Sequence, residues 1–287
     1  MPNNSITTFK KYVPLLDEAY KLASLTGVLD GPEELAREGA NAGELIVPIM
    51  TLQGLTNYTR NTGYTDGTAT LTNQTYACDY NRGRMFTIDN LDNAETAGVA
   101  FGRLAGEFIR NHVGPELDAW RIAKYAGTSG VGAATAADLS TGEQVVAALR
   151  AASNAMDNAE VPLNERFLFI LPSLLALVED LDTTKSRAVL ARFEQIVQVP
   201  QTRMYTGVTL SNSGAGGYSK ASGAKNLNFL VVHKPAVIQY NKHIAPKVIT
   251  PEQNPTADAW KFGYRVCGIA SVYDQKKAGV YVHSATA

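Results

Sequence analysis

The residue types that most often perform catalysis are scattered along this chain without the spacing that a catalytic or metal site requires. Its histidines stand in no HExxH or HxH arrangement, and no GxSxG motif occurs. No nucleophile, metal set or acid–base pair stands out, so we expect no enzyme activity, no cofactor and no metal ion. The four histidines are His112, His233, His243 and His283.

Two glycine clusters could suggest a phosphate site, but neither has the required context. GVGAAT, which begins at Gly130, loosely resembles a dinucleotide fingerprint, yet no convincing strand precedes it. GAGG, which begins at Gly214, belongs to a glycine–serine stretch that is typical of a flexible loop. No GxxxxGK phosphate loop occurs, so we expect ordinary loops at both places.

The remaining reactive groups have ordinary structural interpretations. Cys78 and Cys267 lie far apart and match no zinc spacing, which predicts two free thiols in a reducing compartment. His112 is expected at the C-terminus of a helix, where its charge would favour the helix dipole. The acidic pair Glu179–Asp180 predicts a solvated helix face.

Composition indicates a chain that can bury a sizeable core, because 45% of its residues are hydrophobic. The net charge of −1 argues against a protein held on nucleic acid by a strong overall positive charge. From Ser219 onward, however, nine Lys and Arg stand against three Asp and Glu. This basic region either complements an acidic part of the same or another chain, or it touches nucleic acid. No signal-peptide or membrane-spanning run occurs, so the sequence predicts a soluble protein made in a cytoplasm.

A polar stretch from Asn57 to Asp89 predicts a long hairpin without a core of its own. Its expected strands, Thr56–Tyr64 and Thr68–Tyr76, are rich in β-branched and aromatic residues, and Asp66–Gly67 between them is typical of a type I′ turn. Neither strand has a clean apolar face, and an isolated two-stranded hairpin is marginally stable in water. We therefore expect its stability to come from a partner surface, such as that of another subunit.

The residues before this hairpin, 1–42, predict an arm that packs on something else rather than a domain. One short helix is expected after Pro14, and Gly27 and Gly31 are expected to end it. The run ELIVPIM then predicts entry into a strand.

The residues after the hairpin predict a strand at RMFTID and then the strongest helix of the chain. Asp92 and Glu95 predict its capping box, and apolar residues spaced three and four apart continue to Val113. Gly114–Pro115 predicts a break or kink, followed by a second short helix with the proline at its first position.

The second half of the chain predicts alternating helices and strands. Small residues at 128–138 predict a linker and the boundary to a second domain. Leu139–Leu181 predicts a helix, a strand and a helix, with Thr141 at the start of the first. Further strands are expected on both sides of a glycine–serine loop at 211–226.

Several of these motifs occur together in one known family. The pattern Y-x-R-x-x-G-Y-x-x-G matches Tyr58, Arg60, Gly63, Tyr64 and Gly67. An R-x-F-x-I-D strand, a helix start containing ET and the sequence PELDAWR follow in order. The chain thereby resembles the major capsid proteins of tailed bacteriophages, which have the Hong Kong 97-like fold. The resemblance covers nearly the whole chain, and the C-terminal part matches more loosely.

The resemblance implies an α+β chain with a Hong Kong 97-like capsid fold in five parts. These are an N-terminal arm at 1–42, an extended β-hairpin loop with adjoining strands at 43–90, a peripheral domain with a long spine helix at 91–129, an axial domain at 130–255, and return strands to the peripheral domain at 256–287.

The resemblance also implies a structural, non-enzymatic protein that assembles into hexamers and pentamers of an icosahedral shell around phage double-stranded DNA. Its location would be the virion capsid, after synthesis in the host cytoplasm. In the family the extended loop lies across a neighbouring subunit. Arginines in it would pair with carboxylates of that neighbour or lie on an ordinary solvated strand face. The expected inter-subunit contacts are Tyr58, Arg60, Tyr64, Asp66, Tyr76, Tyr80, Arg82 and Arg84.

Further partners follow from the same resemblance. The family often fuses a scaffolding segment to the N-terminus, and residues 1–42 are too short for one. Either scaffolding is a separate protein, or a fused segment is removed before Met1. The initiator methionine favours a separate scaffolding protein, which is expected together with a portal protein and decoration proteins. Packaged DNA is expected to make weak, non-specific contact, and no membrane is expected.

Two alternatives remain open at this point. An encapsulin-type nanocompartment shell protein has the same fold and a similar length, and it would enclose a cargo enzyme instead of DNA. An enzyme with an α/β domain at Leu139–Leu181 belongs to a different class, and it would need a polar pocket.

The lysine content of the hairpin yields a first prediction. One branch of the family cross-links its subunits through a lysine of the extended loop, but Asn57–Asp89 contains no lysine. We expect particles of this protein to run as monomers on SDS gels after boiling. A covalent ladder that persists after boiling would contradict this expectation.

Overall fold

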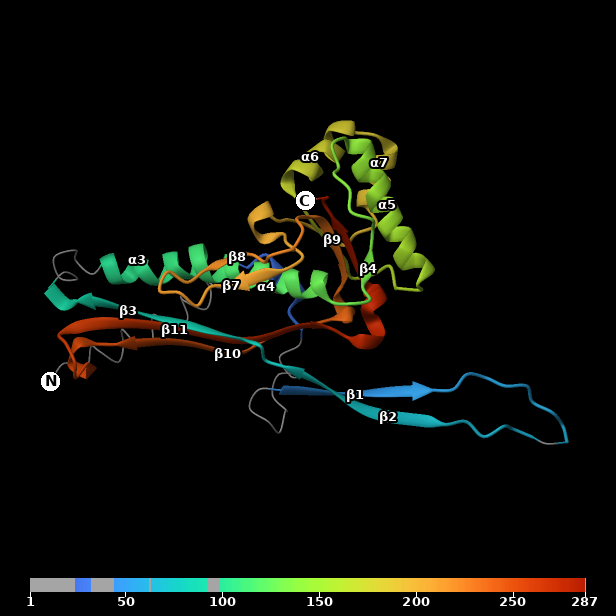
Figure 1. The fold of residues 1–287 in the computed structure, drawn as a ribbon, viewed down its shortest axis with the longest axis horizontal. Helices are drawn as coiled ribbons and strands as arrows, with labels where there is room; N and C mark the ends of the chain where they lie inside the picture. Colours follow the sequence, from blue (N-terminus) through green and yellow to red (C-terminus); the bar gives the residue numbers. More distant parts are fainter. Residues whose placement is uncertain (1–23, 32–43, 62, 92–98, 287) are drawn as a thin grey trace.

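A long sheet with a helix, a second sheet with shorter helices, and a projecting hairpin follow one another along the molecule (Figure 1). The computed structural model describes residues 24–31, 44–61, 63–91 and 99–286. Helices and strands occur in mixed order, so the α+β fold class is confirmed.

The long sheet is antiparallel and has the strand order β10-β11-β3. The expected strand at RMFTID is confirmed as part of β3. One face of the sheet packs on the long helix, where Phe108 makes ring contacts with Phe86 and Tyr264 at centroid distances of 4.8 and 6.4 Å. The strands are β3 (Tyr80–Asp89), β10 (Val237–Ile249) and β11 (Ala259–Val272).

The long helix changes to a second segment at Gly114 with Pro115 in its first turn, as expected, although the irregularity before it is a π-helical turn and the helix does not end there. It runs through α3 (Val99–Phe108), the π-helical turn η3 (Ile109–Val113) and α4 (Gly114–Gly127). A proline has no N–H to donate and crowds the preceding turn. Here that turn widens instead of breaking, and the Gly114 N–H donates to the Ile109 carbonyl, five residues back.

Two details of this helix follow from the same geometry. His112 lies inside the helix and not at its C-terminus, so the expected dipole role is wrong. The expected capping box at Asp92 and Glu95 lies outside the described residues. No helix that the structure describes is both long and apolar enough to cross a membrane.

The second sheet has five strands in the order β4-β12-β9-β5-β6. Its strands β5 and β9 are buried along their whole length. The expected linker at 128–138 contributes the short edge strand β4, which pairs with β12. The strands are β4 (Gly132–Ala133), β5 (Arg166–Ile170), β6 (Gln195–Gln198), β9 (Leu227–His233) and β12 (Val280–Ser284).

Three helices pack around this sheet, and the expected helix, strand and helix within Leu139–Leu181 are confirmed. Thr141 caps the first helix in a capping box with Gln144. Pro172 stands at the start of the next helix, where its missing N–H does no harm. The helices are α5 (Gly142–Asn158), α6 (Pro172–Leu181) and α7 (Thr184–Leu190).

Short elements connect these layers. The expected loop at 211–226 contains β8 (Tyr218–Lys220), which pairs with β7 (Val208–Leu210) in a small hairpin. Gly27 does not end a helix but lies within a 3-10 turn, and the residues before Ser24 lie outside the description. The 3-10 turns are Thr26–Leu29, Gln201–Arg203, Lys234–Ala236, Pro251–Gln253 and Asp274–Gly279.

The projecting hairpin exists, but its expected strand pairing is wrong. The strand β1 (Glu44–Leu52) pairs with β2 (Ala69–Ala77), so Thr56–Tyr64 belongs to a long connecting loop. Asp66–Gly67 forms no type I′ turn, because such a turn needs positive φ at both residues and neither has it. In this loop the positive φ falls on Gly63, at 75°.

Two glycines give a matched test of packing in this fold. A Cβ at Gly142 would lie 2.1 Å from the Leu177 carbonyl oxygen, whereas a Cβ at Gly106 would meet nothing within 4 Å. We expect Gly142→Ala to lower the free energy of unfolding by about 1–3 kcal/mol through overpacking. Gly106→Ala should raise it by about 0.5–1 kcal/mol, because alanine favours the helix. Urea unfolding of the unassembled subunit measures both, and equal effects of the two changes would contradict the packing.

Candidate assembly surface

The projecting hairpin is attached to the body at its base. Leu45 and Tyr76 face each other across the β1–β2 ladder and are 6% and 8% exposed. They pack with Ile238, Tyr240 and Ile269 in a small core that is separate from the main one. The hairpin therefore has a fixed origin on β10 and β11, and the rest of it extends away from the body (Figure 1).

Beyond this base, one side of the hairpin presents large apolar side chains to solvent. Side chains alternate between the two faces of a strand. Ile46, Met50 and Leu52 therefore share one face of β1, and Leu71, the ladder partner of Met50, continues that face on β2. Met50, Leu52 and Leu71 are 57%, 66% and 62% exposed. We call these four residues the apolar face of the hairpin.

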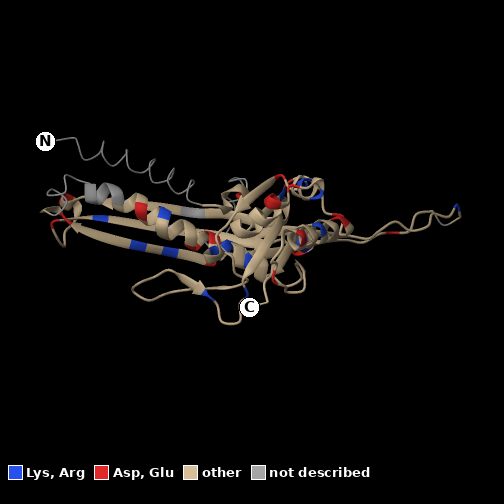
Figure 2. Ribbon diagram, turned by 90° about the horizontal axis from the view of Figure 1, so that it is seen from above, with Lys and Arg blue, Asp and Glu red and all other residues tan. Residues whose placement is uncertain are grey.

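The loop that closes the hairpin adds aromatic and aliphatic groups. Leu55 is fully exposed, and the exposed rings of Tyr58 and Tyr64 lie against each other with centroids 5.0 Å apart. The hairpin carries few charges along its length (Figure 2). Isolated exposed apolar residues are common on proteins, but a contiguous exposed group of this kind marks an interaction surface.

The eight predicted contact residues divide into two groups. Tyr58, Arg60, Tyr64 and Asp66 lie exposed in the loop that closes the hairpin. Their contact with a neighbour stays a prediction. The other four residues, which are Tyr76, Tyr80, Arg82 and Arg84, lie on the body or at the hairpin base and have partners within this chain.

The body partners of this second group are specific. The Tyr80 side chain is 2% exposed, and its hydroxyl donates to Glu116 Oε1 at 3.1 Å. Arg82 Nε forms an ion pair with the same oxygen at 2.5 Å. Arg84 donates to the carbonyl oxygens of Gly214 and Ala215. The role expected for these residues at a neighbouring subunit also stays a prediction.

The sequence interpretation described the hairpin as polar and did not identify its apolar face. The signal was present in the run ELIVPIMTL, whose alternate residues Ile46, Met50 and Leu52 fall on one side once the strand is drawn. The expected first strand, Thr56–Tyr64, does not contain these residues. Their position on one face becomes visible only when Glu44–Leu52 is paired with β2.

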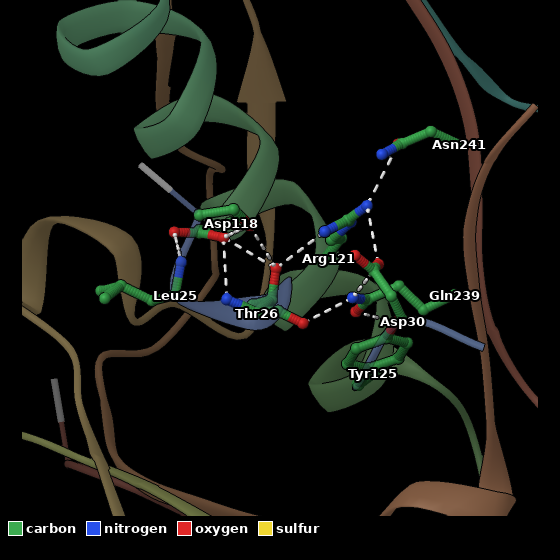
Figure 3. Close-up of polar contacts among 9 residues, drawn as sticks. Leu25, Thr26, Asp30, Asp118, Arg121, Tyr125, Gln239 and Asn241 are labelled. Carbon is green, nitrogen blue, oxygen red and sulfur yellow. Dashed lines mark hydrogen bonds and ion pairs between the residues drawn. The ribbon is translucent and has the colours of Figure 1, made fainter. Parts of the chain in front are cut away.

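A second arrangement that was not predicted holds the described N-terminal segment to the body (Figure 3). The buried carboxylate of Asp118, in α4, accepts five hydrogen bonds. The Leu25 and Thr26 N–H groups donate to it at 2.9 and 3.1 Å, and the Ser24 and Thr26 hydroxyls donate at 2.8 and 2.7 Å. Arg203, in the turn before β7, donates to it at 3.0 Å and completes the set.

The same network continues from α4 to β10. Arg121 donates to the Thr26 hydroxyl at 3.0 Å, and that hydroxyl in turn donates to Asp118. Gln239 donates to the Thr26 carbonyl at 2.5 Å and accepts from the Tyr125 hydroxyl at 2.7 Å. Burial raises the pKa of Tyr125, so its phenol stays protonated and keeps this donor. We call this network the Asp118 joint.

The enzyme alternative would need a polar pocket, and the helices of Leu139–Leu181 border one groove that both polar and apolar side chains line. A groove of about 790 Å³ lies between α5 and α7. The residues that line it include Glu143 and Arg150 but no His, Cys, Ser or Asp. Within 24–31, 44–61, 63–91 and 99–286, no three His, Cys, Asp or Glu side chains gather to hold a metal ion.

The Asp118 joint yields a stability prediction. We expect Asp118→Asn to lower the free energy of unfolding by about 3–5 kcal/mol, because it leaves buried donors facing a neutral amide. Asp180→Asn is the matched control, since Asp180 lies exposed on α6 and its change should stay within about 0.5 kcal/mol. Urea unfolding of unassembled subunits measures both values. A near-neutral Asp118→Asn variant would show that the joint does not hold the segment.

Comparison with known proteins gives a clear result at the level of structure alone. No protein-family model matches the chain, and no curated protein matches it in sequence. A structure from Mycobacterium phage Che8 is 13% identical, with 89% of each chain covered and a TM-score of 0.59. The capsid of cyanophage P-SCSP1u is 17% identical, with 87% of this chain and 85% of that one covered and a TM-score of 0.57.

A further match is to a virus-like particle from Pyrococcus furiosus. It is 11% identical, covers 96% of this chain and 98% of its own, and has a TM-score of 0.59. Identities this low establish the fold and nothing finer. The α+β arrangement of long helix, two sheets and projecting hairpin is therefore the Hong Kong 97-like capsid fold, the fold of tailed-phage major capsid proteins.

Proposed function

We propose that this protein is the major capsid protein of a tailed bacteriophage, a non-enzymatic subunit that builds an icosahedral shell. One observation carries the proposal: a chain with the capsid fold holds out a hairpin whose apolar face has no cover among the described residues. A second copy of the chain is the partner that this hairpin fits, because a shell repeats one subunit and each hairpin then meets an identical neighbour.

The area and chemistry of the apolar face support weak individual contacts. Fully burying a leucine or methionine side chain is worth about 1.5–3 kcal/mol. A few such residues give each hairpin a modest affinity, and each subunit of a closed shell has several neighbours, so the contacts reinforce one another. Weak single contacts also let misplaced subunits leave, which favours closed shells.

The proposal includes the finer organisation that the resemblance implies. The five parts at 1–42, 43–90, 91–129, 130–255 and 256–287 would be the arm, extended loop, peripheral domain, axial domain and return strands. Subunits would form hexamers and pentamers around packaged double-stranded DNA, with weak DNA contact. A separate scaffolding protein, a portal protein and decoration proteins would complete the virion.

The second candidate is an encapsulin-type nanocompartment shell. The match to a virus-like particle from Pyrococcus furiosus is the reason to retain this second candidate, because that match spans nearly the whole of both chains. The contents of particles purified from the native source separate the two candidates. Nuclease-protected double-stranded DNA supports the phage capsid, whereas a stoichiometric cargo protein without DNA supports the nanocompartment.

The apolar face gives a direct test of assembly. We expect the unaltered chain, co-expressed with its neighbouring genes so that any scaffolding protein is present, to form closed particles in negative-stain electron microscopy. The double variant Met50→Lys, Leu71→Lys puts two charges on the apolar face. It should raise the concentration needed for assembly at least about tenfold, since each lost contact is worth 1.4 kcal/mol or more.

The matched control changes the other face of the same strands. Thr51 and Thr70 are ladder partners, are exposed and lie one residue away on each strand. Thr51→Lys, Thr70→Lys should therefore leave the assembly threshold close to that of the parent. Equal losses in both double variants, or no loss in the first, would refute the role of the apolar face. Circular dichroism confirms that each variant is folded.

A further inference from the structure

A second hairpin braces the two sheets against each other. The strands β7 and β8 leave the part of the chain that contains the five-stranded sheet and run alongside the long helix toward β3 (Figure 1). The loop between them, residues 211–217, ends against two arginines of β3. Arg82 and Arg84 are two residues apart, so they project from the same face of that strand.

Arg82 supplies the inner half of this contact. Its Nε forms an ion pair with Glu116, at the beginning of α4, at 2.5 Å. Its Nη2 donates to the Ser211 carbonyl at 2.8 Å, and its Nη1 donates to the Asn212 side chain at 3.3 Å. One guanidinium thus joins β3, the long helix and the 211–217 loop, because the planar group of an arginine has several N–H donors that point in different directions.

Arg84 supplies the outer half. It donates through Nη1 to the Ala215 carbonyl at 3.3 Å and through Nη2 to the Gly214 carbonyl. These contacts are with neutral carbonyl groups, and no ion pair of Arg84 with a carboxylate occurs among the described residues. Hydrogen bonds from a charged donor are stronger than neutral ones, so this contact holds the loop without a counter-charge.

The loop has the backbone geometry that such a contact needs. Gly216 and Gly217 have φ of 69° and 82°, a region that side chains other than glycine disfavour. The Ser211 N–H donates to the Gly217 carbonyl at 2.8 Å, and the Gly216 N–H donates to the Ser213 carbonyl at 3.0 Å. The loop is therefore closed on itself and presents its remaining carbonyls outward to the arginines.

The position of this contact gives it mechanical importance. The helix α4 packs against both β11 and β12, so it is shared by the long sheet and the five-stranded sheet. The two sheets also share one hydrophobic core, and a contact that lies away from this core adds resistance to a change in the angle between them. The contact of β7–β8 with β3 is such a contact.

We propose that the 211–217 loop, held by Arg82 and Arg84, is a latch that fixes the angle between the two sheets. This inference rests on the proposed function, since in a shell that angle sets the curvature between neighbouring subunits. An open latch would let the angle vary more widely, and shells of more than one diameter would form.

Hydrogen–deuterium exchange of unassembled subunits tests the latch itself. In Arg84→Ala, the amides of Ser211 and Gly216 should exchange at least about tenfold faster than in the parent. Arg84→Lys keeps the charge but loses the two guanidinium nitrogens that donate to the loop, so the same amides should also exchange faster in this variant. Arg150→Ala is the matched control, because Arg150 is exposed on α5, away from the loop. Unchanged exchange in Arg84→Ala would overturn the latch.

Electron microscopy of assembled particles tests the consequence for the shell. Arg84→Ala should give a broader distribution of diameters than the parent, and Arg150→Ala should give the parent distribution. Faster exchange with an unchanged diameter distribution would overturn the control of curvature. If the parent forms no particles even when its neighbouring genes are co-expressed, the proposed function fails, while the exchange experiment still decides the latch.

Discussion

A single buried carboxylate determines how the parts of this molecule meet. Asp118 is fully buried, and a buried charge is stable only when its hydrogen bonds are complete. Its donors come from the N-terminal segment at Ser24–Thr26 and from the turn at Arg203. Arg121 and Gln239 extend the network to β10, as Figure 3 shows. The long helix, β10 of the long sheet, the turn at Arg203 and the described N-terminal segment are thereby held together.

The hairpin follows the opposite principle. Its base is fixed by the small core around Leu45 and Tyr76, but Met50, Leu52 and Leu71 are left in water. A two-stranded ribbon of this kind gains little stability alone. The body holds its shape through a hydrophobic core and buried polar networks, whereas the hairpin leaves apolar area exposed beyond its base. This division suits a subunit that must be stable before assembly and adhesive during it.

The comparisons show that chains with very little sequence identity can adopt the same fold. Structures only 11–17% identical superpose over most of this chain. What such chains can share is the order of elements and the pattern of burial, which many residue combinations satisfy. The Asp118 joint and the Arg82–Arg84 latch are made of particular side chains, so a likeness in fold alone does not extend to them.

The sequence by itself determined the elements whose signals are local. Capping at Thr141, the apolar run Phe167–Ile170 and the family motif from Tyr58 to Gly67 led to the α+β capsid fold. Only the tertiary structure decided the rest. Ladder pairing moved the first hairpin strand to Glu44–Leu52, and a widened turn carried the helix through Pro115. Both depend on contacts between residues far apart in sequence or on hydrogen bonds that a local pattern does not encode.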